Sequence, residues 1–138
     1  MGSTFIDIEA TIAADLSKVW DYWTKPEHIT KWNFADDSWH CPSAENEMKA
    51  GGKYIARMEA KDGSFGFDFE ATYDEIINHK KISYTIADGR GVTTDFESHG
   101  DSTTVKTSFV AEGTNPIEMQ KNGWQAILNN FKKYTESN

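Results

Sequence analysis

The sequence predicts an α+β fold in which a curved antiparallel sheet of about six to seven strands wraps around one long C-terminal helix. Two patterns support this prediction. Apolar and polar residues alternate through most of the chain, as in half-buried strands, whereas the last part has apolar residues three and four positions apart. The 138 residues suffice for one domain with its own core, and no internal repeat or linker divides them. We therefore expect a single domain over residues 1–138.

The N-terminal part predicts one strand followed by two short helices. Residues 4–12 alternate between apolar and polar side chains, which indicates the strand. From Asp15, a suitable N-cap, apolar residues recur at the spacing of an amphipathic helix. The run from Thr24 to Glu27 has the pattern of a capping box, with Pro26 in the first turn. It predicts that a second short helix starts there with Thr24 as its N-cap.

The middle of the chain predicts an antiparallel meander. Residues 33–48 are polar and are expected to be irregular, and strands resume after the turn at Gly51 and Gly52. Short turns rich in Asp and Gly separate most of the alternating segments that follow. These segments are 53–60, 65–73, 81–87, 92–97 and 103–111. Acidic residues that fall opposite the apolar face predict a solvated outer surface, and they are Asp7, Glu9, Asp68, Glu70, Asp95 and Glu97.

The C-terminal part predicts the long helix that covers the sheet. Asn115 is a suitable N-cap, with proline at the first helical position and Glu118 three residues on. The apolar stripe continues to about Thr135 and includes Met119 and Trp124 on the predicted inward face. The apolar face of an antiparallel sheet must be covered, and this helix is the one predicted element long enough to do it.

Composition argues against nucleic acids and membranes as binding partners of this protein. The net charge is −8, from 14 basic and 22 acidic residues, so the surface repels nucleic-acid phosphates and anionic lipids. No apolar run is long enough to cross a bilayer, and the N-terminus lacks the pattern of a secretory signal. The single cysteine, Cys41, rules out an internal disulfide and fits a reducing compartment. We expect a cytoplasmic protein that binds neither nucleic acid nor membrane.

The order of predicted elements resembles the helix-grip fold of START-like proteins, also called the SRPBCC or Bet v 1-like superfamily. Within it, the motifs are similar to the stand-alone bacterial form of the family of activators of the 90-kDa heat-shock-protein ATPase. They are VWDYWTKPEHITKW, KAGGKYIARMEAKDGSFGFDFEATYDEI and NPIEMQKNGWQAILNNFKKYTE. The resemblance implies binding of apolar or aromatic small molecules, with scattered enzymes and with eukaryotic co-chaperones among the relatives. The polar link at 33–48 departs from the short glycine-containing link typical of the family.

Large aromatic and apolar side chains gather on the predicted inward faces. Rigid side chains around a helix with Gly123 in its middle are compatible with plain core packing and with the wall of a cavity. The cavity interpretation predicts a set of lining residues that includes two threonine hydroxyls. This set is Trp20, Trp23, Trp32, Met58, Phe67, Phe69, Tyr84, Thr94, Phe96, Thr107, Met119 and Trp124.

Metal and catalytic motifs are weak in this sequence. Asp36, Asp37, His40 and Cys41 include metal-ligand types, but neighbours in an extended segment point to opposite sides. No second Cys/His pair completes a tetrahedral site. No catalytic triad order, phosphate loop or dinucleotide motif is present. We therefore predict no metal and no cofactor, and we assign no catalytic residue.

Three functions remain open. The favoured one is a non-catalytic binding protein with an internal hydrophobic cavity for an aromatic, polyketide-like or lipid-like ligand. The alternative is a co-chaperone-like module that binds a heat-shock chaperone and stimulates its ATPase. The second alternative is a cyclase, dehydratase or hydrolase acting on a hydrophobic substrate, which requires an ionisable group that projects into the cavity.

Overall fold

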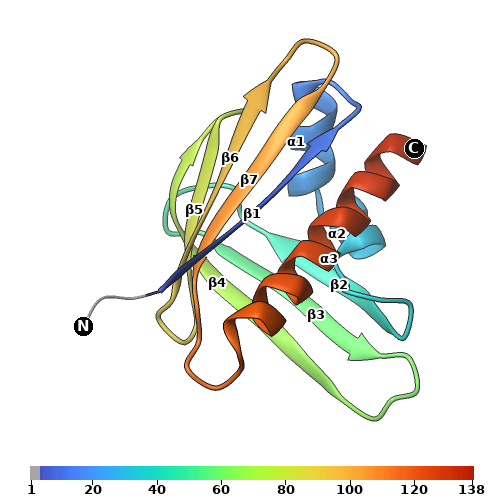
Figure 1. Ribbon diagram of the computed structural model, residues 1–138, viewed down its shortest axis with the longest axis vertical. Coiled ribbons are helices and arrows are strands. Elements are labelled where there is room, and N and C mark those ends of the chain that lie inside the picture. The colour runs from blue at the N-terminus through green and yellow to red at the C-terminus, as the bar shows by residue number, and fades with distance from the viewer. Residues whose placement is uncertain (1–3) are drawn as a thin grey trace.

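The computed structural model describes residues 4–138 and shows a seven-stranded antiparallel sheet that curves around a long helix (Figure 1). The elements are β1 (Phe5–Ile12), α1 (Leu16–Thr24), α2 (Pro26–Trp32), β2 (Trp39–Asn46), β3 (Lys53–Ala60), β4 (Gly66–Ile77), β5 (Lys81–Ile86), β6 (Gly91–Ser98), β7 (Thr103–Val110) and α3 (Ile117–Ser137). This architecture confirms the predicted α+β helix-grip fold, including the two short helices after the first strand.

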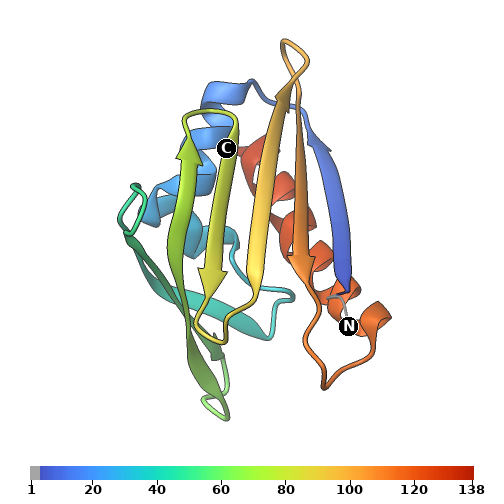
Figure 2. The ribbon, with the colours of Figure 1, turned by 90° about the vertical axis from the view of Figure 1, so that its left-hand side faces the viewer.

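The sheet has the strand order β1-β7-β6-β5-β4-β3-β2, so β1 and β2 are its edges. Helix α3 packs against β1, α2 packs against β2, and the two helices contact each other. The helices therefore bridge the two edges of the sheet. Figure 2 looks onto the outer face of the sheet and shows the helices behind it. Among residues 4–138, no helix is both long enough and apolar enough to cross a membrane.

The start of α1 follows the prediction, but the start of α2 does not. The Asp15 carboxylate accepts a hydrogen bond from the backbone N–H of Lys18 at 2.9 Å, so it caps α1. The predicted capping box at Thr24 is wrong, because the Thr24 hydroxyl donates to the carbonyl of Trp20 at 2.8 Å inside α1. The N-cap of α2 is Lys25, whose extended backbone is the conformation favoured for a residue that precedes proline. Pro26 is the first helical residue, as predicted.

The segment expected to be irregular contains the edge strand β2. It pairs with β3, and a bulge lies between His40 and Ser43, next to Pro42. A proline is tolerated here because an edge strand leaves some backbone groups unpaired. The sequence does not predict this strand, because most of its side chains are polar. Cys41 is its one buried side chain. Bulges and prolines of this kind also discourage further strand pairing at an edge.

The hairpin of β3 and β4 reaches beyond the N-terminal end of α3, at the lower right of Figure 1. Phe65 and Phe67 carry the alternation predicted for an inward face, but they are 61% and 42% exposed. The alternation identifies the correct face of the strand. It does not show how far along the strand the helix covers that face. Strand β4 also continues past its predicted end at Tyr73 to Ile77, with a register shift between Tyr73 and Glu75.

Helix α3 begins later than predicted. Its N-cap is Pro116, so Asn115 lies outside the helix and the predicted cap is wrong. Met119 was expected to face inward but is 62% exposed, and its neighbour Gln120 is buried in its place. The Gln120 side chain accepts from the N–H of Glu112 at 2.9 Å and donates to the carbonyl of Asn115 at 2.7 Å. A polar side chain therefore takes the inward position, because it satisfies the backbone of the preceding loop.

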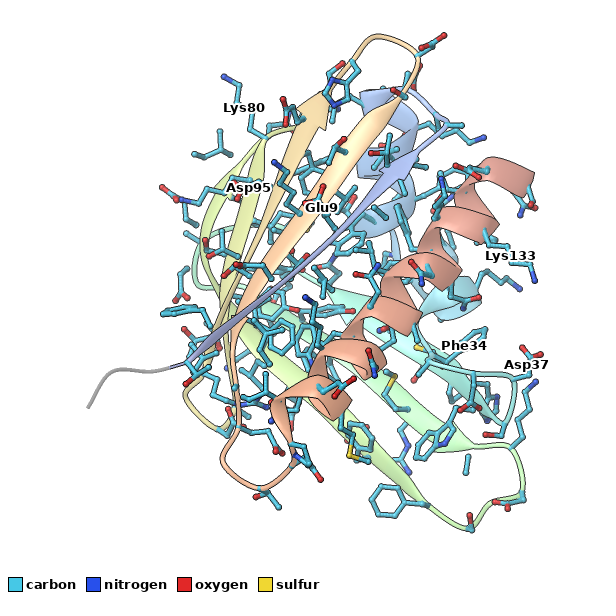
Figure 3. The ribbon with its side chains drawn as sticks, viewed as in Figure 1. Glu9, Phe34, Asp37, Lys80, Asp95 and Lys133 are labelled. Atoms are coloured by element: carbon cyan, nitrogen blue, oxygen red, sulfur yellow. The ribbon has the colours of Figure 1, made fainter. Side chains whose placement is uncertain are left out.

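The core lies between the concave face of the sheet and α3. Phe109 from β7 and Phe131 from α3 are fully buried there. All the acidic residues predicted for the outer face are exposed, which confirms the predicted orientation of their strands. In Figure 3, Asp95 and Lys80 project from the side of the sheet opposite α3, and Lys133 lies on the far side of the helix.

Candidate functional site

A cavity of about 310 Å³ lies between the sheet and the helices. Every strand except β2, and all three helices, contribute to its wall. Its lining residues are Ile8, Trp23, Trp32, Asn33, Tyr54, Met58, Phe67, Phe69, Tyr73, Ile82, Tyr84, Arg90, Thr94, Thr107, Trp124, Ile127 and Leu128. Aromatic rings dominate this set, and the polar groups are few, as is usual for small-molecule sites.

The wall formed by the two short helices consists of stacked indoles. Trp23 of α1 and Trp32 of α2 stack with ring centroids 5.0 Å apart and an interplanar angle of 27°. Each indole also forms an edge-to-face contact with the ring of Phe131, with ring centroids 4.9 Å apart. The Trp32 N–H donates to the carbonyl of Tyr22 at 2.9 Å, so the polar atom of this indole is satisfied outside the cavity. These contacts hold both indoles in fixed orientations.

The wall formed by the sheet contains three tyrosines. The rings of Tyr54, Tyr73 and Tyr84 lie 5.9–6.2 Å apart. The hydroxyl of Tyr54 accepts a hydrogen bond from the Asn33 amide at 3.0 Å, and the hydroxyl of Tyr73 donates to the Asn46 carbonyl oxygen. Burial raises the pKa of all three phenols, because it penalises the phenolate, and the neighbouring tyrosines add to the rise for Tyr54 and Tyr73. All three are therefore neutral hydrogen-bonding groups at neutral pH.

The remaining polar lining groups are two threonines and one arginine. Thr94 and Thr107 lie opposite each other on β6 and β7, with their hydroxyl oxygens 2.9 Å apart. The Arg90 guanidinium follows the β5–β6 turn and donates to the Asp88 carboxylate at 2.8 Å and to the Val110 carbonyl at 3.2 Å. The Asp88 carboxylate therefore offsets the charge of this cation, and the two contacts use two of its five N–H donors.

The structure brings most of the predicted site residues together around the cavity. Three do not line it. Trp20 and Phe96 pack against each other in the core, with ring centroids 5.1 Å apart, because α1 approaches β6 at that end of the sheet. Met119 lies on the exposed side of α3 for the reason given above. The remaining predicted residues, which do line it, are Trp23, Trp32, Met58, Phe67, Phe69, Tyr84, Thr94, Thr107 and Trp124.

The lining residues absent from the prediction fall into two groups. The first group stands on alternating strand positions or on the apolar stripe of the long helix, so periodicity places its members on the correct face without distinguishing core from cavity. They are Ile8, Tyr54, Tyr73, Ile82, Ile127 and Leu128. Asn33 is the C-cap of α2, and Arg90 follows a turn. No local sequence pattern indicates that either of these two side chains reaches the cavity. Their positions depend on how distant elements pack.

The His40–Cys41 segment lies outside the cavity lining. Cys41 is buried, and its thiol lies 3.4 Å from the carbonyl of Ser43, whereas His40 is half-exposed with its Nε2 3.5 Å from a Glu59 carboxylate oxygen. Burial raises the pKa of the Cys41 thiol to about 11, so it is protonated at neutral pH and is a poor nucleophile. Within residues 4–138, no group of three or more His, Cys, Asp or Glu side chains is arranged to hold a metal ion.

Known proteins share both the sequence and the fold. The family model described as "Activator of Hsp90 ATPase homolog 1-like protein" matches residues 13–136. The AHSA1-like protein from Aeromonas hydrophila is 38% identical with a TM-score of 0.92, over 97% of this chain and 93% of that chain. A protein from Cytophaga hutchinsonii is 51% identical with a TM-score of 0.83, over 96% of this chain and 92% of that chain.

More distant structures share the fold alone. A protein from Chromobacterium violaceum is 19% identical with a TM-score of 0.84, over 96% of both chains. A comparison with curated proteins gives no match. The family match and the two more similar structures show that this chain belongs to the family of activator of Hsp90 ATPase homolog 1-like proteins, within the START/Bet v 1-like SRPBCC superfamily.

Proposed function

We propose that this protein binds an aromatic, polyketide-like or lipid-like small molecule in the cavity between the sheet and α3, without catalysing a reaction. The observation that carries the proposal is the lining, in which aromatic rings from both short helices, the sheet and α3 surround one cavity. Burial of a flat apolar ligand against these rings contributes about 25 cal/mol per Å² of apolar surface removed from water. Stacked and edge-on contacts with the rings add to this.

The size of the cavity favours a compact ligand. Its volume of about 310 Å³ lies at the lower end of the range of ordinary ligand sites. A small polycyclic molecule suits this space better than a long acyl chain. A longer apolar substituent would extend out of the cavity along the exposed rings of Phe65 and Phe67 near the hairpin tip. Phe67 connects the two regions, because it is exposed and also lines the cavity.

The protonation states of the lining groups support binding rather than acid–base catalysis. The raised pKa values of the three phenols keep them protonated, so they act as hydrogen-bond donors and are unsuited to accept protons from a substrate. Among the described residues that line the cavity, none carries a carboxylate, an imidazole or a thiol.

A panel of flavonoids, polyketides and fatty acids tests the proposal. We expect at least one class to raise the melting temperature and quench tryptophan fluorescence, because several indoles lie in or beside the wall. Ile127→Trp places a bulky ring into the lining on α3 and should abolish binding. Lys133→Trp makes the same change on the exposed side of the same helix and should bind as the wild type does. The absence of any shift or quenching across the panel would contradict the proposal.

A second candidate function rests on an exposed surface that adjoins the cavity at Phe67. Trp39, Phe65 and Phe67 form an aromatic ledge, with Trp39 5.9 Å from Phe65 and 6.2 Å from Phe67 between ring centroids. Exposed aromatic clusters of this kind mark interaction sites. Together with the family membership, the ledge supports a co-chaperone-like contact with a heat-shock ATPase. Stimulation of a purified heat-shock ATPase that is lost in Trp39→Ala and kept in Ile127→Trp would support this function over the first.

A further inference from the structure

Tyr84 differs from the other two tyrosines of the cavity wall. Tyr54 and Tyr73 each share a hydrogen bond with an asparagine, whereas within residues 4–138 no group forms a hydrogen bond with the Tyr84 hydroxyl. In the same part of the chain, one buried side-chain oxygen has neither a hydrogen-bond partner nor any exposed surface, and it belongs to Thr135. The Tyr84 oxygen, which also lacks a partner, is not fully enclosed in this way. The Tyr84 oxygen therefore faces open space. Tyr84 is half-buried and lines the cavity, so its unpartnered hydroxyl is available to a molecule in that space.

Tyr54 provides a second donor beside Tyr84. Its oxygen accepts the hydrogen bond of the Asn33 amide, which leaves its own hydroxyl hydrogen free to donate. The Tyr54 and Tyr84 ring centroids are 5.9 Å apart, and both side chains line the cavity. The raised pKa of each phenol keeps the donor hydrogen in place. The cavity lining therefore includes two neighbouring tyrosine rings whose hydroxyl hydrogens are not used in hydrogen bonds within residues 4–138, and the counterpart of such donors is an acceptor oxygen on the ligand.

The charges around the cavity indicate what kind of acceptor fits. Among the described lining residues, Arg90 is the one charged side chain, and Asp88 and the Val110 carbonyl already engage its guanidinium. A buried carboxylate needs a cation to offset the loss of its hydration, and the one cation of this lining is already paired with Asp88. The net charge of −8 adds a general repulsion of anions. A neutral acceptor oxygen avoids both the burial of an unpaired charge and the repulsion by the acidic protein.

We propose that the ligand of this cavity carries a neutral carbonyl-type oxygen, as in an aryl ketone, quinone or ester, and that this oxygen accepts hydrogen bonds from Tyr84 and Tyr54. This inference rests on the proposed binding function and specifies the ligand class. It places the flat apolar body of the ligand against the indoles of Trp23 and Trp124 and its oxygen against the sheet. It also ranks free fatty acids and other carboxylates below neutral carbonyl compounds of similar size.

Two probes of nearly the same shape test the role of the oxygen. 2-Acetylnaphthalene carries a ketone, and 2-isopropenylnaphthalene replaces that oxygen with a carbon. Fluorescence titration of the wild type should show the ketone binding about three- to tenfold more tightly, the range expected for one or two buried hydrogen bonds. In Tyr84→Phe, which removes only this hydroxyl and leaves the Tyr54 donor, the preference should fall by about twofold or more from its wild-type value.

Tyr73→Phe is the matched control, because it removes a cavity hydroxyl that already donates to Asn46. It should keep the ratio between the two probes whatever it does to the affinity for both. The anionic probe 2-naphthoate should bind more weakly than the ketone. Circular dichroism of each variant verifies that it is folded before the titration.

The possible outcomes distinguish an error in the ligand class from an error in the binding function. Equal affinity for ketone and alkene in the wild type, an undiminished preference in Tyr84→Phe, or tighter binding of 2-naphthoate would overturn the carbonyl inference and leave the binding function intact. Failure of both neutral probes to bind at millimolar concentration would count against the binding function and the inference together.

Discussion

At the scale of single residues, Asn46 connects the cavity wall to the short helices. Its carbonyl oxygen accepts the hydroxyl hydrogen of Tyr73, and its amide donates to the carbonyl of Thr24 at 2.6 Å. Thr24 ends α1, and the Thr24 carbonyl is among the last four of that helix, which have no partner within it. One side chain thus satisfies the helix end and fixes the position of a cavity phenol.

Removal of this link should lower stability. Asn46→Ala leaves the Tyr73 hydroxyl and the Thr24 carbonyl without these partners, and we expect a loss of about 1–3 kcal/mol in the free energy of unfolding. Urea denaturation measures it. In a Tyr73→Phe background the cost of Asn46→Ala should be smaller, because one of its partners is already gone. Full additivity of the two changes would show that the hydrogen bond contributes nothing.

At the scale of elements, the first turn of α3 shows where sequence periodicity stops being sufficient. The apolar stripe predicts the helix and most of its inward face, but not its first turn, where Gln120 is buried and Met119 is exposed. The spacing of side chains says nothing about the loop before the helix, whose backbone groups need the Gln120 amide.

These adjacent residues provide a matched pair of variants. Gln120→Ala leaves the N–H of Glu112 and the carbonyl of Asn115 without this partner and should cost about 1–2 kcal/mol. Met119→Ala changes an exposed side chain and should stay within about 0.5 kcal/mol of the wild type. Thermal or urea unfolding gives both values. A larger loss of unfolding free energy for Met119→Ala than for Gln120→Ala would contradict the claim that Gln120 stabilises the first turn.

Periodicity is likewise insufficient to predict how two strands and the cavity pack. Clean alternation predicts β4 and its face, but the exposure of Phe65 depends on where α3 begins relative to the hairpin. Strand β2 packs against α2 but has Cys41 as its one buried side chain, so it lacks a clean apolar alternation. Within the cavity, the aromatic residues were predictable from periodicity. The open space between them was not, because it depends on how far α3 stands from the sheet.

At the scale of the whole molecule, the buried phenols make stability depend on alkaline pH. Burial raises the pKa of Tyr54, Tyr73 and Tyr84 above the value of about 10 for an unfolded chain. Each phenol therefore contributes stability that is fully present below about pH 10 and is lost as the pH rises toward its pKa in the folded state. The unfolded chain releases these protons first, so alkaline pH favours unfolding.

The expected decline is up to about 1.4 kcal/mol per pH unit for each phenol above about pH 10. Urea unfolding between about pH 8 and about pH 11 measures it. Tyr84→Phe removes one ionising group from the unfolded chain and should decline less steeply than the wild type. A free energy of unfolding that stays constant over this range would show that the three phenols are not shielded from solvent.

The location of the bound ligand tests the central claim most directly. The claim is that the ligand lies between the sheet and α3, and intermolecular nuclear Overhauser effects in the complex with 2-acetylnaphthalene measure its position. We expect effects to the ring protons of Trp23, Tyr84 and Trp124, which line the cavity. Effects confined to Trp39 and Phe65 on the exposed ledge would contradict the claim and favour a surface that recruits a partner.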